Sequence, residues 1–159
     1  MIKYYENVLS ITELNYINGL LNSCKWGFGF VSTDKNKPIW NFDKQFGKPI
    51  AEIIHSKLND FILSDWHING QTINLDAAPH RDDYPKSNGK NGCTHAFVYF
   101  PMDWEQSWGG NLCILNDEEI EITPRKNFGV LFDANYMHYA KAPLISKFRI
   151  SVGLKLYKD

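Results

Sequence analysis

The chain has 159 residues, of which 43% are apolar and 14% aromatic, and its formal net charge at pH 7 is −1. A chain of this length and composition can bury a core without disulfide bonds, so we expect one domain covering residues 1–159. The near-zero charge gives no support for a nucleic-acid or membrane partner bound through broad electrostatics. No window approaches the ~18 apolar residues of a membrane span, and the N-terminus lacks the apolar region of a signal peptide, so we expect a soluble cytoplasmic protein.

The cysteines and arginines of the chain are few. Cys24, Cys93 and Cys113 show no metal-site spacing, which favours reduced thiols in a reducing compartment. Arginine occurs only at positions 81, 125 and 149, against 14 lysines. Because arginine is rare in this chain, each arginine is a candidate for a specific role.

The N-terminal part, residues 1–64, reads as mainly helical. Residues 10–23 open with Ser10 and Glu13 in capping-box spacing, and apolar residues then fall on one helical face. A similar apolar stripe over residues 46–63 predicts a second helix. The irregular stretch 27–45 between them indicates either a pair of short strands or a long functional loop.

From residue 65 the pattern changes to strands. Short runs rich in β-branched and aromatic residues, separated by Pro, Gly, Asn and Asp, predict strands over residues 66–75, 94–100, 111–115, 119–123, 128–134, 138–144 and 148–157. A hairpin is expected to turn at Asn116-Asp117. Seven strands without intervening helices favour an α+β fold that is mainly β, in which residues 65–157 form a jelly-roll-like sandwich or barrel and the helices pack on one face.

His80 and Asp82 are two residues apart, so their side chains share one face if the chain is extended there. His138, at the start of a later predicted strand, is the candidate for a third ligand. Two histidines and one carboxylate form the facial triad suited to non-haem Fe(II), which leaves coordination positions open. Arg81 is expected to point away from such a site, and the neighbouring Asp83 is the residue most easily confused with Asp82.

The remaining histidines, His55, His67 and His95, are expected to be ordinary packed or surface residues. Eleven residues after His138 stands Arg149, and Ser151 follows on the same face of the last predicted strand. Arginine suits a buried carboxylate because its planar fork pairs bidentately and stays charged. The hydroxyl of Ser151 can add a second donor.

Two stretches carry a family resemblance. The stretch "HRDDYPKSNGKNGCTHAFVYFPMDWEQSWGGNLCIL" has an H-x-D motif, a strand ending near a tyrosine, D-W and G-G-x-L. The stretch "PRKNFGVLFDANYMHYAKAPLISKFRISVGLKLY" has P, G-x-L-x-F, H and R in the matching order. Together they resemble the Fe(II)/2-oxoglutarate-dependent oxygenases of the prolyl 4-hydroxylase-like group, over about residues 74–156. The C-terminal strand departs from the pattern, with leucine where relatives often have tryptophan.

The resemblance implies a double-stranded β-helix (jelly-roll, cupin-like) and an oxygenase that consumes dioxygen, with ascorbate as a candidate reductant. It implies that Fe(II) is held by His80, Asp82 and His138, with no catalytic residue beyond these ligands. It further implies that Arg149 grips 2-oxoglutarate, with Tyr99 offering its phenol to the same carboxylate. The strand before the H-x-D motif supplies Gln71 and Asn74 as alternatives for one more contact.

The expected reaction is the hydroxylation of an unactivated C–H bond coupled to decarboxylation of 2-oxoglutarate. The first choice of substrate is a prolyl or other side chain in a peptide or protein, with a small metabolite as the alternative and a nucleobase disfavoured. Two other classes stay open: a cupin-like metalloenzyme that does not use 2-oxoglutarate, and a metal-free binding module. Residues 83–92 and 27–45 are candidates for a substrate lid because their Gly and Asn content is compatible with motion. The oligomeric state is left open.

Overall fold

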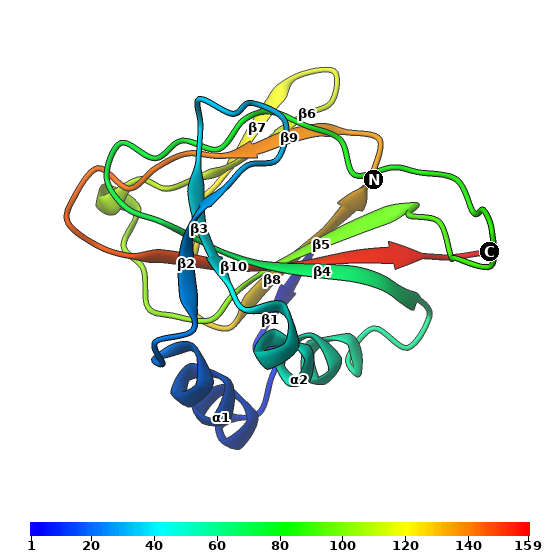
Figure 1. Cartoon of the computed structure of the whole chain (residues 1–159), viewed down its shortest axis with the longest axis horizontal. Helices are drawn as coiled ribbons and strands as arrows, with labels where there is room; N and C mark the ends of the chain where they lie inside the picture. The colour runs from blue at the N-terminus through cyan, green and yellow to red at the C-terminus, as the bar shows by residue number, and fades with distance from the viewer.

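The computed structural model describes all 159 residues as two β-sheets with two helices on the outer face of the larger sheet (Figure 1). In chain order the elements are β1 (Ile2–Glu6), α1 (Ile11–Leu21), β2 (Trp26–Phe30), β3 (Ile39–Phe42), α2 (Lys44–His55), β4 (Ile62–Gln71), β5 (His95–Phe100), a 3-10 turn (Gln106–Trp108), β6 (Leu112–Leu115), β7 (Glu119–Ile122), β8 (Phe128–Asp133), β9 (Met137–Ala140) and β10 (Arg149–Tyr157). The major sheet has the order β1-β8-β5-β10-β4-β3-β2, and the minor sheet has the order β7-β6-β9.

The strands of the major sheet alternate between two buried surfaces. On β10, Ile150, Val152, Leu154 and Leu156 belong to the hydrophobic cluster that includes the residues of α1 and α2. On β5, Ala96 and Phe100 point the other way, into a second cluster between the two sheets. Because successive strand residues face opposite sides, one sheet supplies a core for the helices on one side and a core or cavity wall on the other.

Helix α1 begins as expected. The Ser10 side chain accepts from the backbone N–H of Glu13, and the Glu13 carboxylate accepts from the backbone N–H of Ser10, so the predicted capping box is confirmed. Helix α2 begins at an Asp43 cap and ends at His55, so the expectation of a helix through residue 63 was wrong at its end. Turns follow the helix, and Ile62 already belongs to β4, whose apolar residues continue the helical spacing by coincidence.

The N-terminal part contains strands as well as helices. Strand β1 was not expected; it pairs antiparallel with β8 from Ile2 opposite Phe132 to Glu6 opposite Phe128. Of the two alternatives for residues 27–45, the pair of short strands is the one observed, because β2 pairs with β3 and β3 pairs with β4. These strands extend the major sheet at both edges.

The seven strands expected after residue 65 are present, although β4 and β9 end four residues earlier than expected. Strands β6 and β7 form the expected hairpin around Asn116-Asp117. The segment 77–84 lies beside β9, where the backbones of His80 and His138 exchange both hydrogen bonds. The two facing sheets give the double-stranded β-helix, so the expected fold class is confirmed. Neither helix combines the length and the apolar character needed to cross a bilayer.

Candidate active site

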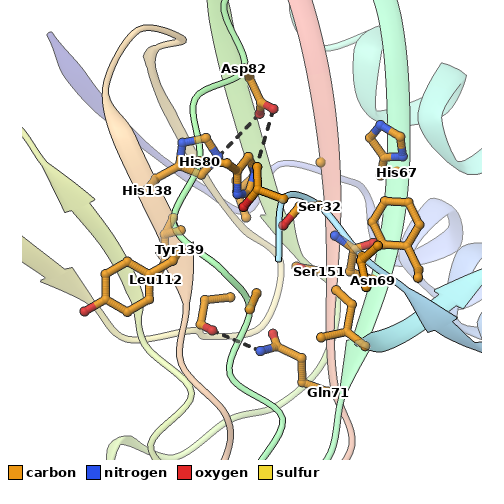
Figure 2. A pocket seen from close by; sticks show the side chains of 18 of the residues that line it. Ser32, His67, Asn69, Gln71, His80, Asp82, Leu112, His138, Tyr139 and Ser151 are labelled. Atoms are coloured by element: carbon orange, nitrogen blue, oxygen red, sulfur yellow. Dashed lines mark hydrogen bonds and ion pairs between the residues drawn. The ribbon is translucent and has the colours of Figure 1, made fainter. Parts of the chain in front are cut away.

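A cavity of about 330 Å³ lies between the two sheets. Alternate residues of β4 and β10 form one wall, and β9 and the 77–84 segment form the opposite wall (Figure 2). Residues 30–33, which begin with the last residue of β2, form part of the rim. The polar and charged residues that line it are Ser32, Thr33, His67, Asn69, Gln71, His80, Arg81, Asp82, His138, Tyr139, Arg149, Ser151 and Lys155.

All three expected metal ligands converge at one end of this cavity. His138 Nε2 lies 3.4 Å from Asp82 Oδ2, and His80 Nε2 lies 3.7 Å from Asp82 Oδ1 (Figure 2). One potential ligand atom from each residue lies within 4.8 Å of the others. Antiparallel bonds between His80 and His138 hold the two rings side by side, with centroids 4.4 Å apart.

The hydrogen bonds of the two histidines prepare Nε2 as the ligand atom. His80 Nδ1 lies 2.9 Å from the carbonyl of Ala78, and His138 Nδ1 lies 3.1 Å from the carbonyl of Tyr136. A carbonyl only accepts, so each Nδ1 carries a proton and donates it, which leaves Nε2, the atom that faces Asp82, as the one available to a metal. Burial, followed by the neighbouring His138, lowers the pKa of His80 and favours the neutral, ligating form.

Asp82 completes a donor set that fits Fe(II). Burial by itself raises the pKa of Asp82, but its hydrogen bond to His138 and the charges of His138, Lys155 and His80 outweigh burial, so the pKa is lowered well below its usual range. The side chain is therefore a carboxylate. Two imidazoles and a carboxylate at this spacing can hold a divalent transition metal and leave positions open for other ligands. Asp83, in contrast, is exposed and lines no part of the cavity.

Arg149 lies deeper in the cavity and is 1% exposed. Its Nε donates to the carbonyl of Gly110 at 2.6 Å, and its Nη1 donates to Gln71 Oε1 at 3.0 Å and to Ser151 Oγ at 3.3 Å. Gln71 is itself oriented, because its Nε2 donates to the carbonyls of Leu75 and Ala140. The guanidinium is thus held in one orientation by groups that are fixed by the fold.

Gly110 makes the close approach to Arg149 possible. Its φ is +72°, and a Cβ at this position would lie 3.0 Å from Arg149 Cδ and 3.1 Å from Trp104 Cζ2. The Gly109-Gly110 turn therefore needs glycine both for its left-handed backbone and for space. The carbonyl of Gly110 provides one of the three hydrogen-bond acceptors of Arg149.

The remaining nitrogen of Arg149, Nη2, is buried without any hydrogen-bond partner. Burial lowers the pKa of Arg149 to about 10, which leaves the guanidinium charged at neutral pH. A buried charged donor without an acceptor is costly, so it indicates that a ligand supplies the acceptor. A carboxylate entering the cavity has the right charge and geometry for this position.

The structure corrects the expectation for Tyr99. Its hydroxyl donates to Asn127 Oδ1 at 2.9 Å inside the core next to the helices, and Tyr99 lines no part of the cavity. Burial raises the pKa of the phenol. The cause is strand alternation: Val98 on β5 faces the cavity, so the next residue must face the opposite side of the sheet.

Asn74 also does not contact the site. It is exposed, with φ +68°, in the turn that follows β4, and it does not line the cavity. Gln71, the alternative on the same segment, is the residue that lines the cavity and binds Arg149. Residues 83–92 supply none of the cavity lining, whereas residues 30–33 from the other lid candidate do.

Three cavity residues were missed or misjudged. Lys155 lies on β10 with its Nζ 3.2 Å from Asp82 Oδ1. His67, expected to be an ordinary histidine, lines the cavity beside Phe30, and Arg81, expected to point away, lines it as well. The signal for Lys155 was available, because residues 149, 151, 153 and 155 share one face of a strand.

The chain matches a known protein family over more than half of its length. The family model described as "2OG-Fe(II) oxygenase superfamily" matches residues 70–154, which include every residue of the histidine–aspartate cluster and Arg149. No curated protein sequence matches the chain.

Solved structures with the same fold cover 99% of the chain. A 2OG-Fe(II) oxygenase family oxidoreductase from Burkholderia pseudomallei has a TM-score of 0.72 and 10% identity, with 85% of that protein covered. A Trichoplax adhaerens prolyl hydroxylase in complex with a hypoxia inducible factor peptide fragment has a TM-score of 0.69 and 15% identity, with 83% covered. A Pseudomonas putida prolyl-4-hydroxylase has a TM-score of 0.61 and 14% identity, with 92% covered. At these identities the likeness establishes the fold.

Proposed function

The chain belongs to the 2OG-Fe(II) oxygenase superfamily, and we propose that it hydroxylates an unactivated C–H bond of a side chain, first of all a prolyl side chain, in a peptide or protein. It is a 2-oxoglutarate-dependent dioxygenase that uses Fe(II). Membership of this family sets aside the cupin-like enzyme without 2-oxoglutarate and the metal-free binding module.

The observation that carries the proposal is the unpaired Nη2 of Arg149 in the same cavity as the histidine–aspartate cluster. We assign His80, Asp82 and His138 as the Fe(II) ligands. We assign Arg149, supported by Ser151, as the residue that binds the distal carboxylate of 2-oxoglutarate. Gln71 positions Arg149 and fixes the direction of its free donor.

When bound, the metal with 2-oxoglutarate and dioxygen supplies the oxidising power that replaces C–H by C–OH. The chain contributes position and exclusion of water. Arg149 places the cosubstrate from the deep end of the cavity, and the backbone pairing of His80 with His138 fixes the metal ligands. Apolar Ile39, Val98 and Leu112 also line the cavity, so the reacting groups are shielded from bulk solvent.

The size of the cavity favours a side chain as the part of the substrate that enters. Its volume of about 330 Å³ must accommodate 2-oxoglutarate as well as the substrate, and this volume is near the lower end of the roughly 300–1,000 Å³ typical of ligand pockets. One side chain of a peptide needs little of that space, and the rest of the peptide can remain outside. A small metabolite with the same chemistry is the alternative. The peptide-bound prolyl hydroxylase of similar fold supports the first choice.

We further propose that residues 1–159 act as a single oxygenase domain. Strands β1, β2 and β3 from the N-terminal part are hydrogen-bonded into the major sheet, and residues 30–33 line the cavity. The N-terminal part therefore contributes both to the core and to the site.

The test is a product assay with synthetic peptides. Each peptide contains one proline, and its control carries alanine in that position; free L-proline tests the metabolite alternative. With Fe(II), ascorbate and 2-oxoglutarate, we expect formation of succinate and a gain of one oxygen atom on a proline peptide, detected by mass spectrometry and traced to labelled dioxygen. Oxidation of free L-proline alone would favour the metabolite. Succinate formation without a modified product from any probe would contradict the peptide proposal.

A further inference from the structure

More cationic than anionic side chains line the cavity. Arg81, Arg149 and Lys155 are cationic, whereas Asp82 is the single carboxylate among the lining residues. The dication Fe(II) and the dianion 2-oxoglutarate cancel each other. In the loaded site the three cationic side chains therefore exceed the one carboxylate, Asp82, by two positive charges.

Lys155 is accessible from the interior of the cavity. Its side chain is 22% exposed and contacts Asp82 Oδ1 at 3.2 Å. Asp65, which lies opposite Lys155 on β4, is already paired with Lys44 and His67, and it does not line the cavity.

The cavity wall next to Lys155 has free space because one position on β10 carries no side chain. Between Ser151 and Lys155 on the cavity face of β10 stands Gly153, and a Cβ at this position would meet only the carbonyl of His67, at 3.7 Å. The absence of a side chain leaves room above the sheet between His67 and the histidine–aspartate cluster. A substrate group in this space has the ammonium of Lys155 on one side.

Arg81 is the second cation at this end of the cavity, and it has no ion-pair partner. The other exposed arginine, Arg125, pairs with Glu6 and stacks over Phe128, and Arg149 is buried. Arg81 makes no ion pair and no side-chain hydrogen bond, although it lines the cavity with the rim residues Ser32 and Thr33. In a chain with three arginines, this one has no structural partner.

We propose that the substrate carries a carboxylate close to the oxidised C–H bond, and that Lys155 and Arg81 bind this carboxylate at the outer end of the cavity. This inference rests on the proposed function and narrows its substrate class. The carboxylate has two possible sources, an acidic residue next to the target side chain in a peptide, or the carboxyl group of a free amino acid. Charge-assisted hydrogen bonds from arginine and lysine distinguish a carboxylate from the neutral amide of the same shape.

The test compares matched probes that differ by one charge. Binding to the Mn(II)·2-oxoglutarate form is measured anaerobically by calorimetry, so no turnover is needed. One pair of probes is a proline peptide flanked by glutamate and the same peptide flanked by glutamine; the other pair is L-proline and L-prolinamide. We expect one carboxylate probe to bind roughly 10- to 100-fold more tightly than its amide, and the pair that shows this preference identifies the source.

Single substitutions show which residues are responsible for the carboxylate preference. Arg81→Gln is expected to remove most of the preference while leaving the dissociation constants of Mn(II) and 2-oxoglutarate unchanged. Lys155→Met is expected to remove it as well, with a small loss of Mn(II) affinity because Lys155 contacts Asp82. Arg125→Gln, which removes an arginine paired elsewhere, is the matched control and should keep the preference.

The outcomes separate this inference from the proposed function. If Mn(II) and 2-oxoglutarate bind but no carboxylate probe binds more tightly than its amide, including the case in which no probe binds, the inference is overturned alone. A preference that survives in both Arg81→Gln and Lys155→Met also overturns it. If neither Mn(II) nor 2-oxoglutarate binds, the proposed function fails and the inference fails with it.

Discussion

The two faces of strand β10 have opposite character. Ile150, Val152, Leu154 and Leu156 face the helices and are buried in the larger hydrophobic cluster. Arg149, Ser151, Gly153 and Lys155 face the cavity. A single strand thus separates stability from chemistry by alternation alone. Substitutions on the helix face should change the free energy of unfolding, and those around the cavity should change binding and turnover.

The largest effect is expected at the metal end of the cavity. In His138→Ala, the loss of one of three proposed ligands should reduce turnover below detection while the protein remains folded. Turnover is measured as succinate formation, and folding by circular dichroism and thermal unfolding. His95→Ala is the matched control, since His95 lies outside the cavity and should be dispensable for turnover. Full activity in His138→Ala would remove this residue from the ligand set.

The next largest effect is expected at Arg149. Arg149→Lys replaces a planar fork by a point charge, and it loses the bonds to Gly110 and Gln71. The KM for 2-oxoglutarate should rise roughly 10- to 100-fold, as expected for the loss of a charge-assisted hydrogen bond. Steady-state kinetics at varied 2-oxoglutarate measure this change, with Arg125→Lys as control. An unchanged KM would place the cosubstrate elsewhere.

On the face of β10 that packs against the helices, a substitution should change stability and leave ligand binding unchanged. Leu154 is 1% exposed, and Leu154→Ala should lower the free energy of unfolding by about 2–5 kcal/mol. The affinity for 2-oxoglutarate should be unchanged wherever the protein is folded. Urea unfolding and calorimetric titration measure the two quantities. Ser151→Ala, on the other face, should show the reverse pattern; equal effects of both variants on both quantities would contradict the separation of the two faces.

A smaller effect is expected at Tyr99. Tyr99→Phe removes the hydrogen bond to Asn127 in the core and should cost about 1 kcal/mol of unfolding free energy. Because the hydroxyl does not reach the cavity, the affinity for 2-oxoglutarate should not change. A clear loss of that affinity would restore Tyr99 to the cosubstrate site.

The smallest effect concerns pH. Burial and the neighbouring His138 lower the pKa of His80 below its ordinary value of 6.5, so the folded apo-protein favours the neutral ring. The stability that this group contributes is complete above pH 6.5 and is lost as the pH falls toward the lowered value. Urea unfolding in chelator should show a loss of stability between pH 7 and 5 that is smaller in His80→Asn. The same dependence of stability on pH in both proteins would contradict the lowered pKa of His80.

Much of the site was predictable because it depends on residue type and short-range geometry. His80, Asp82, His138, Arg149 and Ser151 were chosen as donors of the right chemistry, and the structure brings all five into one cavity. The Ser10–Glu13 capping box is equally local. Such features depend on a few neighbouring residues and on strand alternation.

The failures have both long-range and local causes. Strand β1 exists because β8, more than 120 positions later, offers a free edge, and local pattern gives little sign of such pairing. Tyr99 was assigned to the cosubstrate site from the motif alone. Strand alternation from Val98, which faces the cavity, places the Tyr99 side chain on the opposite face of β5. Asn74 lies in a turn whose geometry only the folded chain reveals. Arg81 lines the cavity although alternation placed it outside, because the 77–84 segment is only partly a strand.

The central claim, that this cavity binds Fe(II) and 2-oxoglutarate, is tested most directly by anaerobic titration of the apo-protein with Fe(II) and then with 2-oxoglutarate. The chelate has a weak visible charge-transfer band. We predict that the band appears in the wild-type protein, is weakened at equal 2-oxoglutarate in Arg149→Ala, and is absent in His138→Ala. Fe(II) binding without a band on addition of 2-oxoglutarate, or a band of full intensity in Arg149→Ala, would contradict the account.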